Sequence, residues 1–86
     1  MQDHLTETDR ALESTILELL AHRGPEKTIC PSDVARLHDP DDWQKLMEPT
    51  RAAAKRLVAK GRIVITQKGK VVDPEHAKGA IRLRIR

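Results

Sequence analysis

The chain has 86 residues with one Trp and no Phe or Tyr, and its formal net charge at pH 7 is +3. This length predicts one domain, residues 1–86, with a small aliphatic core. The lack of aromatic side chains argues against nucleic-acid folds that stack bases on aromatic platforms. No stretch approaches the ~20 apolar residues of a membrane span. The polar N-terminus, of which residues 1–8 are expected to be flexible, has no signal core. A lone cysteine suits a reducing compartment, and we expect a soluble cytoplasmic protein.

The charges are unevenly distributed along the chain. Residues 1–48 carry 5 Lys or Arg and 11 Asp or Glu, whereas residues 49–86 carry 11 and 2. Between Pro49 and Val72 there are seven basic residues and no acid. This split favours a positive face that attracts polyanions. The alternative is a dipolar molecule whose halves pair with each other or with a second copy.

Residues 9–23 have apolar side chains at helical spacing and predict an amphipathic helix. Thr6 and Asp9 have the spacing of a capping box at its start, with Thr8 as the rival N-cap. Gly24-Pro25 is expected to end the helix.

A strand stub is predicted at residues 28–30, followed by a two-turn helix at Pro31–Leu37. Proline is favoured at the first helical position because its missing N–H has no helical partner there. Cys30 precedes this helix, where backbone N–H groups can lower the pKa of a thiol. A redox or catalytic role for Cys30 needs a partner side chain, and the candidates are His22 and His38. A small buried apolar residue is the preferred interpretation of Cys30.

The next apolar pattern is helical but contains Pro49, and a proline inside a helix costs about 3 kcal/mol. We therefore predict a short helix at residues 41–47 and a second helix at residues 49–60 with Pro49 near its start. Trp43 begins the inward pattern, so we expect it to be the largest core anchor. The acidic residues just before it are expected to cap the helix.

Residues 62–67 and 70–72 predict the arms of a β-hairpin around the turn Lys68-Gly69. Residues 75–79 are predicted to be a linker. Residues 81–86 alternate between aliphatic side chains and arginine, which predicts an additional C-terminal strand with its arginines outward. The order helix, strand stub, helix, helix, hairpin is that of a winged helix-turn-helix domain. The predicted class is α+β, mainly α, with three to four helices.

The winged helix-turn-helix interpretation makes residues 49–60 of this chain the recognition helix and residues 62–72 the wing. We expect Thr50, Ala54 and Leu57, with Val58, to face inward. The residues expected to face outward are Arg51, Lys55, Arg56 and Lys60. Duplex DNA is the expected partner, and Gln67 joins the side chains able to reach base edges. The residues predicted to contact nucleic acid are Arg51, Lys55, Arg56, Lys60, Arg62, Lys68, Lys70, Arg82 and Arg84. We predict no enzymatic activity, cofactor or metal site, because the four histidines lack metal spacing and no carboxylate pair is evident.

Two alternatives remain open. Charged residues on a hairpin also protect sheet edges from aggregation, and winged-helix domains also serve as protein-interaction modules. The alternative function is therefore an adaptor that docks an acidic protein partner on the same basic face. A homodimer would add DNA specificity, and the C-terminal strand is the predicted dimer edge through strand addition.

Several short motifs together resemble a small uncharacterised bacterial family, domain of unknown function 3253. The similarity runs from about Leu12 to Arg84. The matching motifs are Ile29-Cys30-Pro31-Ser32, Val34-Ala35-Arg36, Trp43, Leu46-Met47, Arg51, Ala53-Ala54, Gly61, Ile65-Thr66-Gln67-x-Gly69, Asp73-Pro74 and Gly79-Ala80-Ile81-Arg82-Leu83-Arg84. The family often has Glu in place of Asp33 and Pro in place of Ala80. The resemblance implies a winged-helix-like fold and brings no established activity or functional residues.

Overall fold

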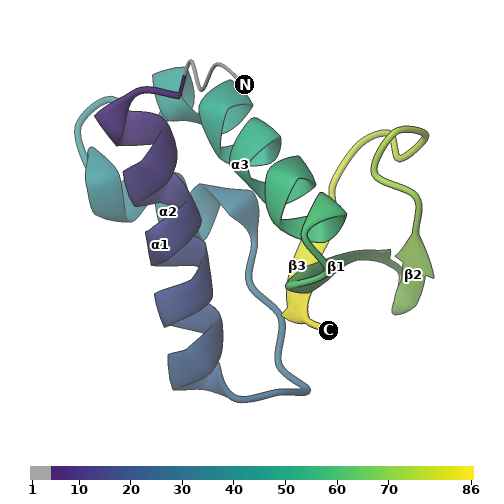
Figure 1. Ribbon diagram of the computed structural model, residues 1–86. Helices are drawn as coiled ribbons and strands as arrows, with labels where there is room; N and C mark the ends of the chain where they lie inside the picture. Colours follow the sequence, from purple (N-terminus) through teal and green to yellow (C-terminus); the bar gives the residue numbers. More distant parts are fainter. Residues whose placement is uncertain (1–4) are drawn as a thin grey trace.

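The computed structural model describes residues 5–86, which form an α+β domain with a three-stranded antiparallel sheet. The elements in chain order are α1 (Glu7–Arg23), α2 (Pro31–His38), the 3-10 helix η1 (Trp43–Leu46), α3 (Met47–Ala59), β1 (Ile63–Gln67), β2 (Lys70–Val72) and β3 (Arg82–Ile85) (Figure 1). The predicted class is confirmed, and the order of elements is winged-helix-like. Across residues 5–86, no helix has both the length and the apolar character needed to cross a membrane.

The start of α1 is held by the predicted capping box. The Thr6 hydroxyl accepts the Asp9 N–H at 3.0 Å, and the Asp9 carboxylate accepts the Thr6 N–H at 3.0 Å. These bonds satisfy two N–H groups that the helix itself leaves without partners. The helix begins at Glu7 and Thr6 is its N-cap, so Glu7 and Thr8, which the sequence assigned to a flexible N-terminus, are helical. Residues 1–4 of that prediction lie outside the described residues.

Pro49 lies in the first turn of α3, as predicted, where its missing N–H costs no helical hydrogen bond. The helix begins two residues earlier than predicted, and the preceding short helix is a single 3-10 turn. At the other end of α3, Gly61 adopts φ +73°. Its N–H donates to Val58 O at 2.9 Å and the Arg62 N–H donates to Leu57 O at 2.9 Å. This Schellman arrangement turns the chain directly into β1.

The sheet has the order β2-β1-β3, with β1 in the centre. Ile65 pairs with Val72 on one side and with Leu83 on the other. On the far side of β3, Ile29 bridges Leu83 through two backbone hydrogen bonds of 2.8 and 3.0 Å. The predicted strand stub is therefore reduced to one bridge. The prediction of an open dimer edge at β3 is wrong at Leu83, because Ile29 of the same chain occupies that position.

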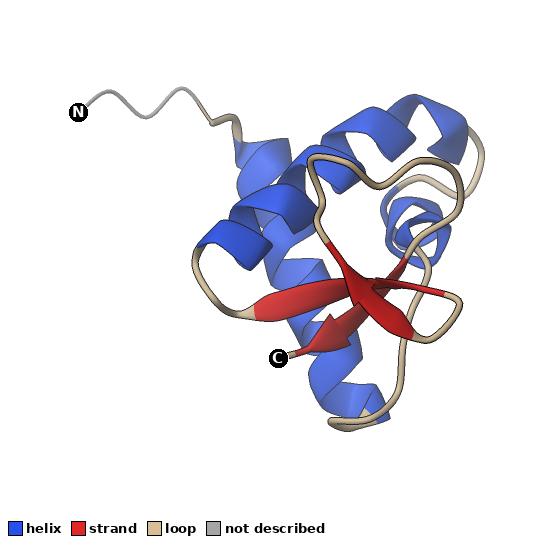
Figure 2. Cartoon of the chain, turned by 90° about the vertical axis from the view of Figure 1, so that its right-hand side faces the viewer, coloured by secondary structure: helices blue, strands red, loops and turns tan. Residues whose placement is uncertain are grey.

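The three helices lie together on one side of the sheet (Figure 2). Between them is an aliphatic core, in which each fully buried Leu, Ile or Val side chain contributes roughly 1.5–3 kcal/mol. The core residues are Leu12, Ile16, Leu20, Ile29, Val34, Ala53, Ala54, Leu57, Ile63, Ile65, Ile81 and Leu83.

Trp43 is not the core anchor that the sequence predicts. It is half-buried and lies outside the buried cluster. The 3-10 turn η1 packs against α2, and the Arg36 guanidinium carbon lies 4.4 Å from the Trp43 ring centroid. The ring therefore covers the outside of α2 in a cation–π contact. The inward prediction for α3 is correct, because Thr50, Ala54 and Leu57 are buried and Val58 packs against the core.

Candidate nucleic-acid interface

The basic residues of α3 divide between two faces of the helix. Arg56 and Lys60 face α1, where both bond to the Glu13 carboxylate. The Arg56 Nε donates to Glu13 Oε2, and the Lys60 ammonium lies 2.9 Å from Glu13 Oε1. A further guanidinium N–H of Arg56 donates to the Asp9 carbonyl oxygen at 3.3 Å. The outward prediction is therefore wrong for Arg56, which is mostly buried against α1, whereas Lys60 is exposed but shares the same carboxylate.

Glu13 is the counterion that makes this arrangement favourable. Its side chain is only 11% exposed, compared with 25% for Arg56 and 58% for Lys60. Burial alone raises the pKa of Glu13, but the hydrogen bonds and charges of Arg56 and Lys60 together outweigh it. The net pKa lies below the ordinary value of 4.5. Glu13 is therefore ionised at neutral pH and neutralises part of the basic helix.

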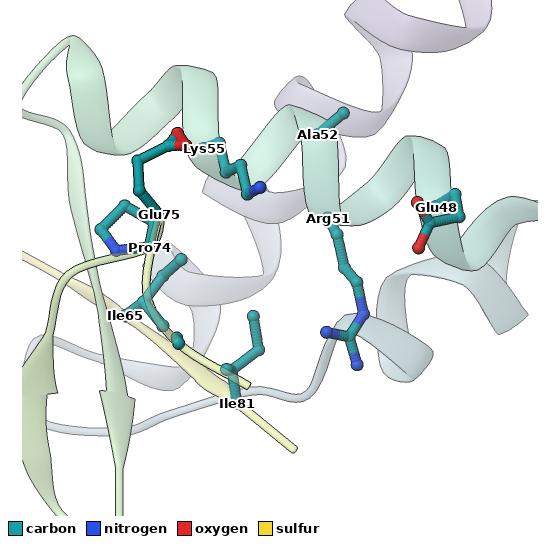
Figure 3. Close-up of a pocket in the computed structure, with 9 residues that line it drawn as sticks. Glu48, Arg51, Ala52, Lys55, Ile65, Pro74, Glu75 and Ile81 are labelled. Carbon is teal, nitrogen blue, oxygen red and sulfur yellow. The ribbon is translucent and has the colours of Figure 1, made fainter. Parts of the chain in front are cut away.

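Arg51 and Lys55 occupy the outward face of α3, as predicted. They line a cleft of about 250 Å³ between α3 and the loop that follows β2 (Figure 3). The cleft has Ile65 and Ile81 among its apolar lining residues. Arg51 is partly covered, and its guanidinium approaches the Gly79 carbonyl oxygen at 3.5 Å. The outward face of α3 is thus bordered by a loop.

Two carboxylates line the same cleft as Arg51 and Lys55. Glu48 comes from the first turn of α3 and Glu75 from the loop after β2. Sequence reasoning treated the residues after the hairpin as a linker and therefore missed Glu75. A partner that approaches this face meets charges of both signs.

The hairpin turn and the residue after it carry exposed cations. Lys68 has φ +51° and Gly69 has φ +80°, which is the type I′ geometry of a two-residue hairpin. Lys68 and Lys70 are both exposed there. Arg62 is also exposed, but it precedes β1 whereas Lys68 follows it. At about 3.3 Å per residue, these two positions are about 20 Å apart along the strand. The structure therefore does not bring all the predicted cations together.

The arginines of β3 project from the sheet as the alternation predicts. Arg82 lies opposite Thr66 and Arg84 opposite Val64. Arg84 is half-buried. The Arg82 guanidinium donates to the Thr28 hydroxyl and to the Cys30 sulfur, both at 2.8 Å. Arg82 is thus held against the segment before α2.

Gln67 and Lys78 have roles that the sequence did not predict. The Gln67 side-chain amide donates to the carbonyl oxygens of Lys78 and Ala80, at 2.6 and 3.1 Å. Gln67 therefore anchors the loop after β2 and is not free to reach a base edge. Lys78 was assigned to a linker, and only the folded loop brings it near the hairpin turn. No local sequence signal could have found this contact, because it joins residues eleven positions apart.

A further polar cluster lies in the segment between α2 and η1. Asp39 accepts the Asp42 N–H at 3.1 Å and pairs with Lys45 at 2.9 Å. Hydrogen bonds from Lys45 and from the Asp42 N–H lower the pKa of Asp39. Over the described part of the chain, no group of three or more His, Cys, Asp or Glu residues is placed to hold a metal ion.

Residues 9–86 match the model of a family described as a protein of unknown function, DUF3253. The chain belongs to the DUF3253 family. The match includes every strand and all but the first two residues of α1, so the resemblance inferred from short motifs is confirmed over a longer stretch. No curated protein matches the sequence. The DUF3253 description assigns no activity, so a function for this domain has to be argued from its surface.

Proposed function

We propose that this DUF3253 domain binds nucleic acid in the cytoplasm, with duplex DNA as its preferred partner. The contact surface would be the hairpin turn and the outward face of α3. One observation carries the proposal. Lys55, Lys68 and Lys70 are exposed, and none of them forms an ion pair with a carboxylate anywhere in residues 5–86.

Unpaired surface cations suit a polyanion for a simple reason. Each phosphate that a cation neutralises releases condensed counterions, and this release drives binding at low salt. The three lysines together with Arg51 would neutralise about four phosphates, giving a slope of log K against log salt of about −3.5. A module of this size buries only about 600–1,000 Å² on DNA. A homodimer on half-sites about one helical turn apart would supply the missing specificity.

The cleft beside α3 favours a second candidate, a protein-interaction adaptor. This cleft combines the cations Arg51 and Lys55 with the carboxylates Glu48 and Glu75 and an apolar lining. Mixed charges around an apolar patch match a peptide side chain better than a phosphate backbone. The two candidates share Arg51 and Lys55, but only the nucleic-acid candidate also uses Lys68 and Lys70. Variants of the hairpin lysines can therefore distinguish them.

The test is binding of a fluorescent mixed-sequence duplex over a range of salt concentrations. Lys68→Glu/Lys70→Glu should weaken binding and flatten the salt slope by about 2, because two phosphate contacts are lost. The matched control is Arg23→Glu/Lys27→Glu, which makes the same charge change on exposed residues at the far end of α1 (Figure 1). Equal losses in both variants would show that only net charge matters.

Absence of duplex binding by the wild-type domain at low salt would overturn the proposal. The adaptor would then be tested by capturing a partner on the purified domain. The Arg51→Glu/Lys55→Glu variant should no longer capture the partner, whereas the Lys68→Glu/Lys70→Glu variant should still capture it.

A further inference from the structure

A second surface groove lies beside the α3 cleft and shares Ile81 with it. The groove has a volume of about 880 Å³ and lies between the hairpin turn, the end of the loop after β2 and the start of β3. We call it the basic groove. Its cations are Lys68, Lys70, Lys78 and Arg82. No Asp or Glu is among its lining residues in the described chain.

The two sides of the basic groove are tied together by one side chain. Gln67, at the end of β1, donates both of its amide hydrogen bonds to the loop, at the carbonyl oxygens of Lys78 and Ala80. The loop that carries Lys78 is therefore held next to the turn that carries Lys68 and Lys70. A site whose walls are already fixed loses less conformational entropy when a ligand binds.

Arg82 is the cation of the basic groove whose side chain is held by hydrogen bonds to neighbouring residues. Three of its N–H groups are used by Thr28 and Cys30, through the hydroxyl, the sulfur and a backbone carbonyl oxygen at 3.3 Å. A guanidinium has five N–H donors, so two remain for a ligand. These contacts pre-organise the planar fork, which is the geometry that binds a phosphate through two hydrogen bonds.

Part of the lining of the basic groove is apolar. Val72, Ala80 and Ile81 line it together with the four cations. Apolar walls lower the local dielectric and strengthen the attraction between a cation and an anion. The four lining cations are all exposed, and because no carboxylate lines the basic groove with them, their combined field attracts an anion.

We propose that the basic groove is a binding site for phosphate esters, held by Arg82 and Lys78 with Lys68 and Lys70. This inference rests on the proposed function in one respect, because we assign the phosphates to the nucleic-acid backbone that continues past the hairpin turn. The same chemistry is offered by a free polyphosphate-bearing molecule such as a nucleotide. Lys78 belongs to the basic groove and not to the surface proposed above, so it separates the two ideas.

The experiment compares the wild-type domain with Lys78→Glu, using inorganic tripolyphosphate and a mixed-sequence duplex as probes. Lys78 is exposed, and its carbonyl contact with Gln67 does not need its side chain. The matched control is Lys27→Glu, an exposed charge reversal in the loop before the strand stub. Thermal unfolding of each variant confirms that it is folded. Dissociation constants and amide chemical shifts are measured for both probes.

We expect tripolyphosphate to shift the amides of Gly69, Lys78 and Arg82, and not those of α1. Lys78→Glu should raise the tripolyphosphate dissociation constant about fivefold, since one surface ion pair becomes a repulsion. It should also raise the duplex dissociation constant and flatten the salt slope by about 0.9, the value of one phosphate contact. Lys27→Glu should change the two dissociation constants only by the small amount that follows from its change in net charge.

The other possible results show which proposal fails, the phosphate site in the basic groove or the binding of nucleic acid. If Lys78→Glu weakens tripolyphosphate but not duplex binding, the site stands and the nucleic-acid assignment is overturned. If the wild type binds tripolyphosphate in the basic groove but no duplex, the proposed function fails and a free phosphate ester is the ligand. If Lys78→Glu matches Lys27→Glu with both probes, the basic groove is not a site. The proposed function then survives if the duplex still depends on Lys68 and Lys70.

Discussion

The α1–α3 contact and the hairpin region take their cations from the same acid-free run of sequence. The cations of the first region are paired with a carboxylate, whereas those of the second are not. Arg56 and Lys60 meet the Glu13 carboxylate of α1. Lys68 and Lys70 extend from a turn with no carboxylate partner in the described chain. Twelve residues separate Arg56 from Lys68, and local composition does not distinguish them. What distinguishes them is the position of one acidic residue, Glu13, on another helix.

This contrast shows how formal charge divides between stability and binding. A cation paired with a buried carboxylate stabilises the fold, because removing its partner leaves a poorly solvated charge. An exposed, unpaired cation contributes little to stability, but it contributes directly to the attraction of a polyanion. The net charge of +9 for residues 49–86 therefore overstates the positive charge that faces solvent.

The largest effect is expected from Glu13→Gln, which removes the shared carboxylate while keeping the size of the side chain. Arg56 is then left largely buried without a counterion. We expect the free energy of unfolding to fall by about 2 kcal/mol, measured by urea denaturation. Glu18→Gln, an exposed change on the same helix, should cost less than about 0.5 kcal/mol. Equal losses of unfolding free energy in the two variants would mean that the pairing of Glu13 with Arg56 and Lys60 does not stabilise the domain.

The pH dependence of stability should show the same contact. The pKa of Glu13 lies below 4.5 in the folded protein, so its contribution is present above about pH 4.5. It is lost as the pH falls through the folded value. The gap in unfolding free energy between the wild type and Glu13→Gln should therefore narrow below about pH 4.5.

Comparison with Glu13→Gln also serves as the control for other acids. The pKa values of Asp39 and Asp73 are lowered too, by Lys45 in the first case and by the Glu75 N–H in the second. Both proteins lose those contributions equally. A gap that stays constant down to about pH 3 would contradict the role of Glu13.

The smallest effect is expected in the hairpin turn and has the opposite sign. Lys68 adopts a positive φ, a conformation that asparagine tolerates better than lysine. Lys68→Asn should raise the free energy of unfolding by about 0.5 kcal/mol, measured by thermal unfolding, while it weakens duplex binding.

Lys70→Asn is the matched control for the turn, because it removes the same charge from a residue of β2. It should weaken duplex binding without stabilising the domain. If Lys68→Asn stabilises the domain and leaves duplex binding unchanged, the hairpin cations serve solubility and the proposed function loses its main support.

Elements that depend on neighbouring residues were predictable from the sequence. Thr6 and Asp9 close the capping box, Pro49 lies in the first turn of α3, and Lys68-Gly69 forms the hairpin turn. Each of these features depends on backbone geometry within a few positions. Trp43 was misplaced because its apolar pattern was continued across a 3-10 turn, which faces the ring towards Arg36.

The sequence alone determined the helices, the hairpin, the alternation of β3 and the family, because each is encoded by spacing, turn chemistry or a local motif. Only the tertiary structure decided which cations face solvent and which groove they line. Glu13 meets Arg56 across 43 positions, Arg82 reaches Cys30 across 52, and Gln67 folds the Lys78 loop towards the hairpin. Such contacts are set by packing between elements, and no periodicity in the chain specifies which side chains packing will bring together.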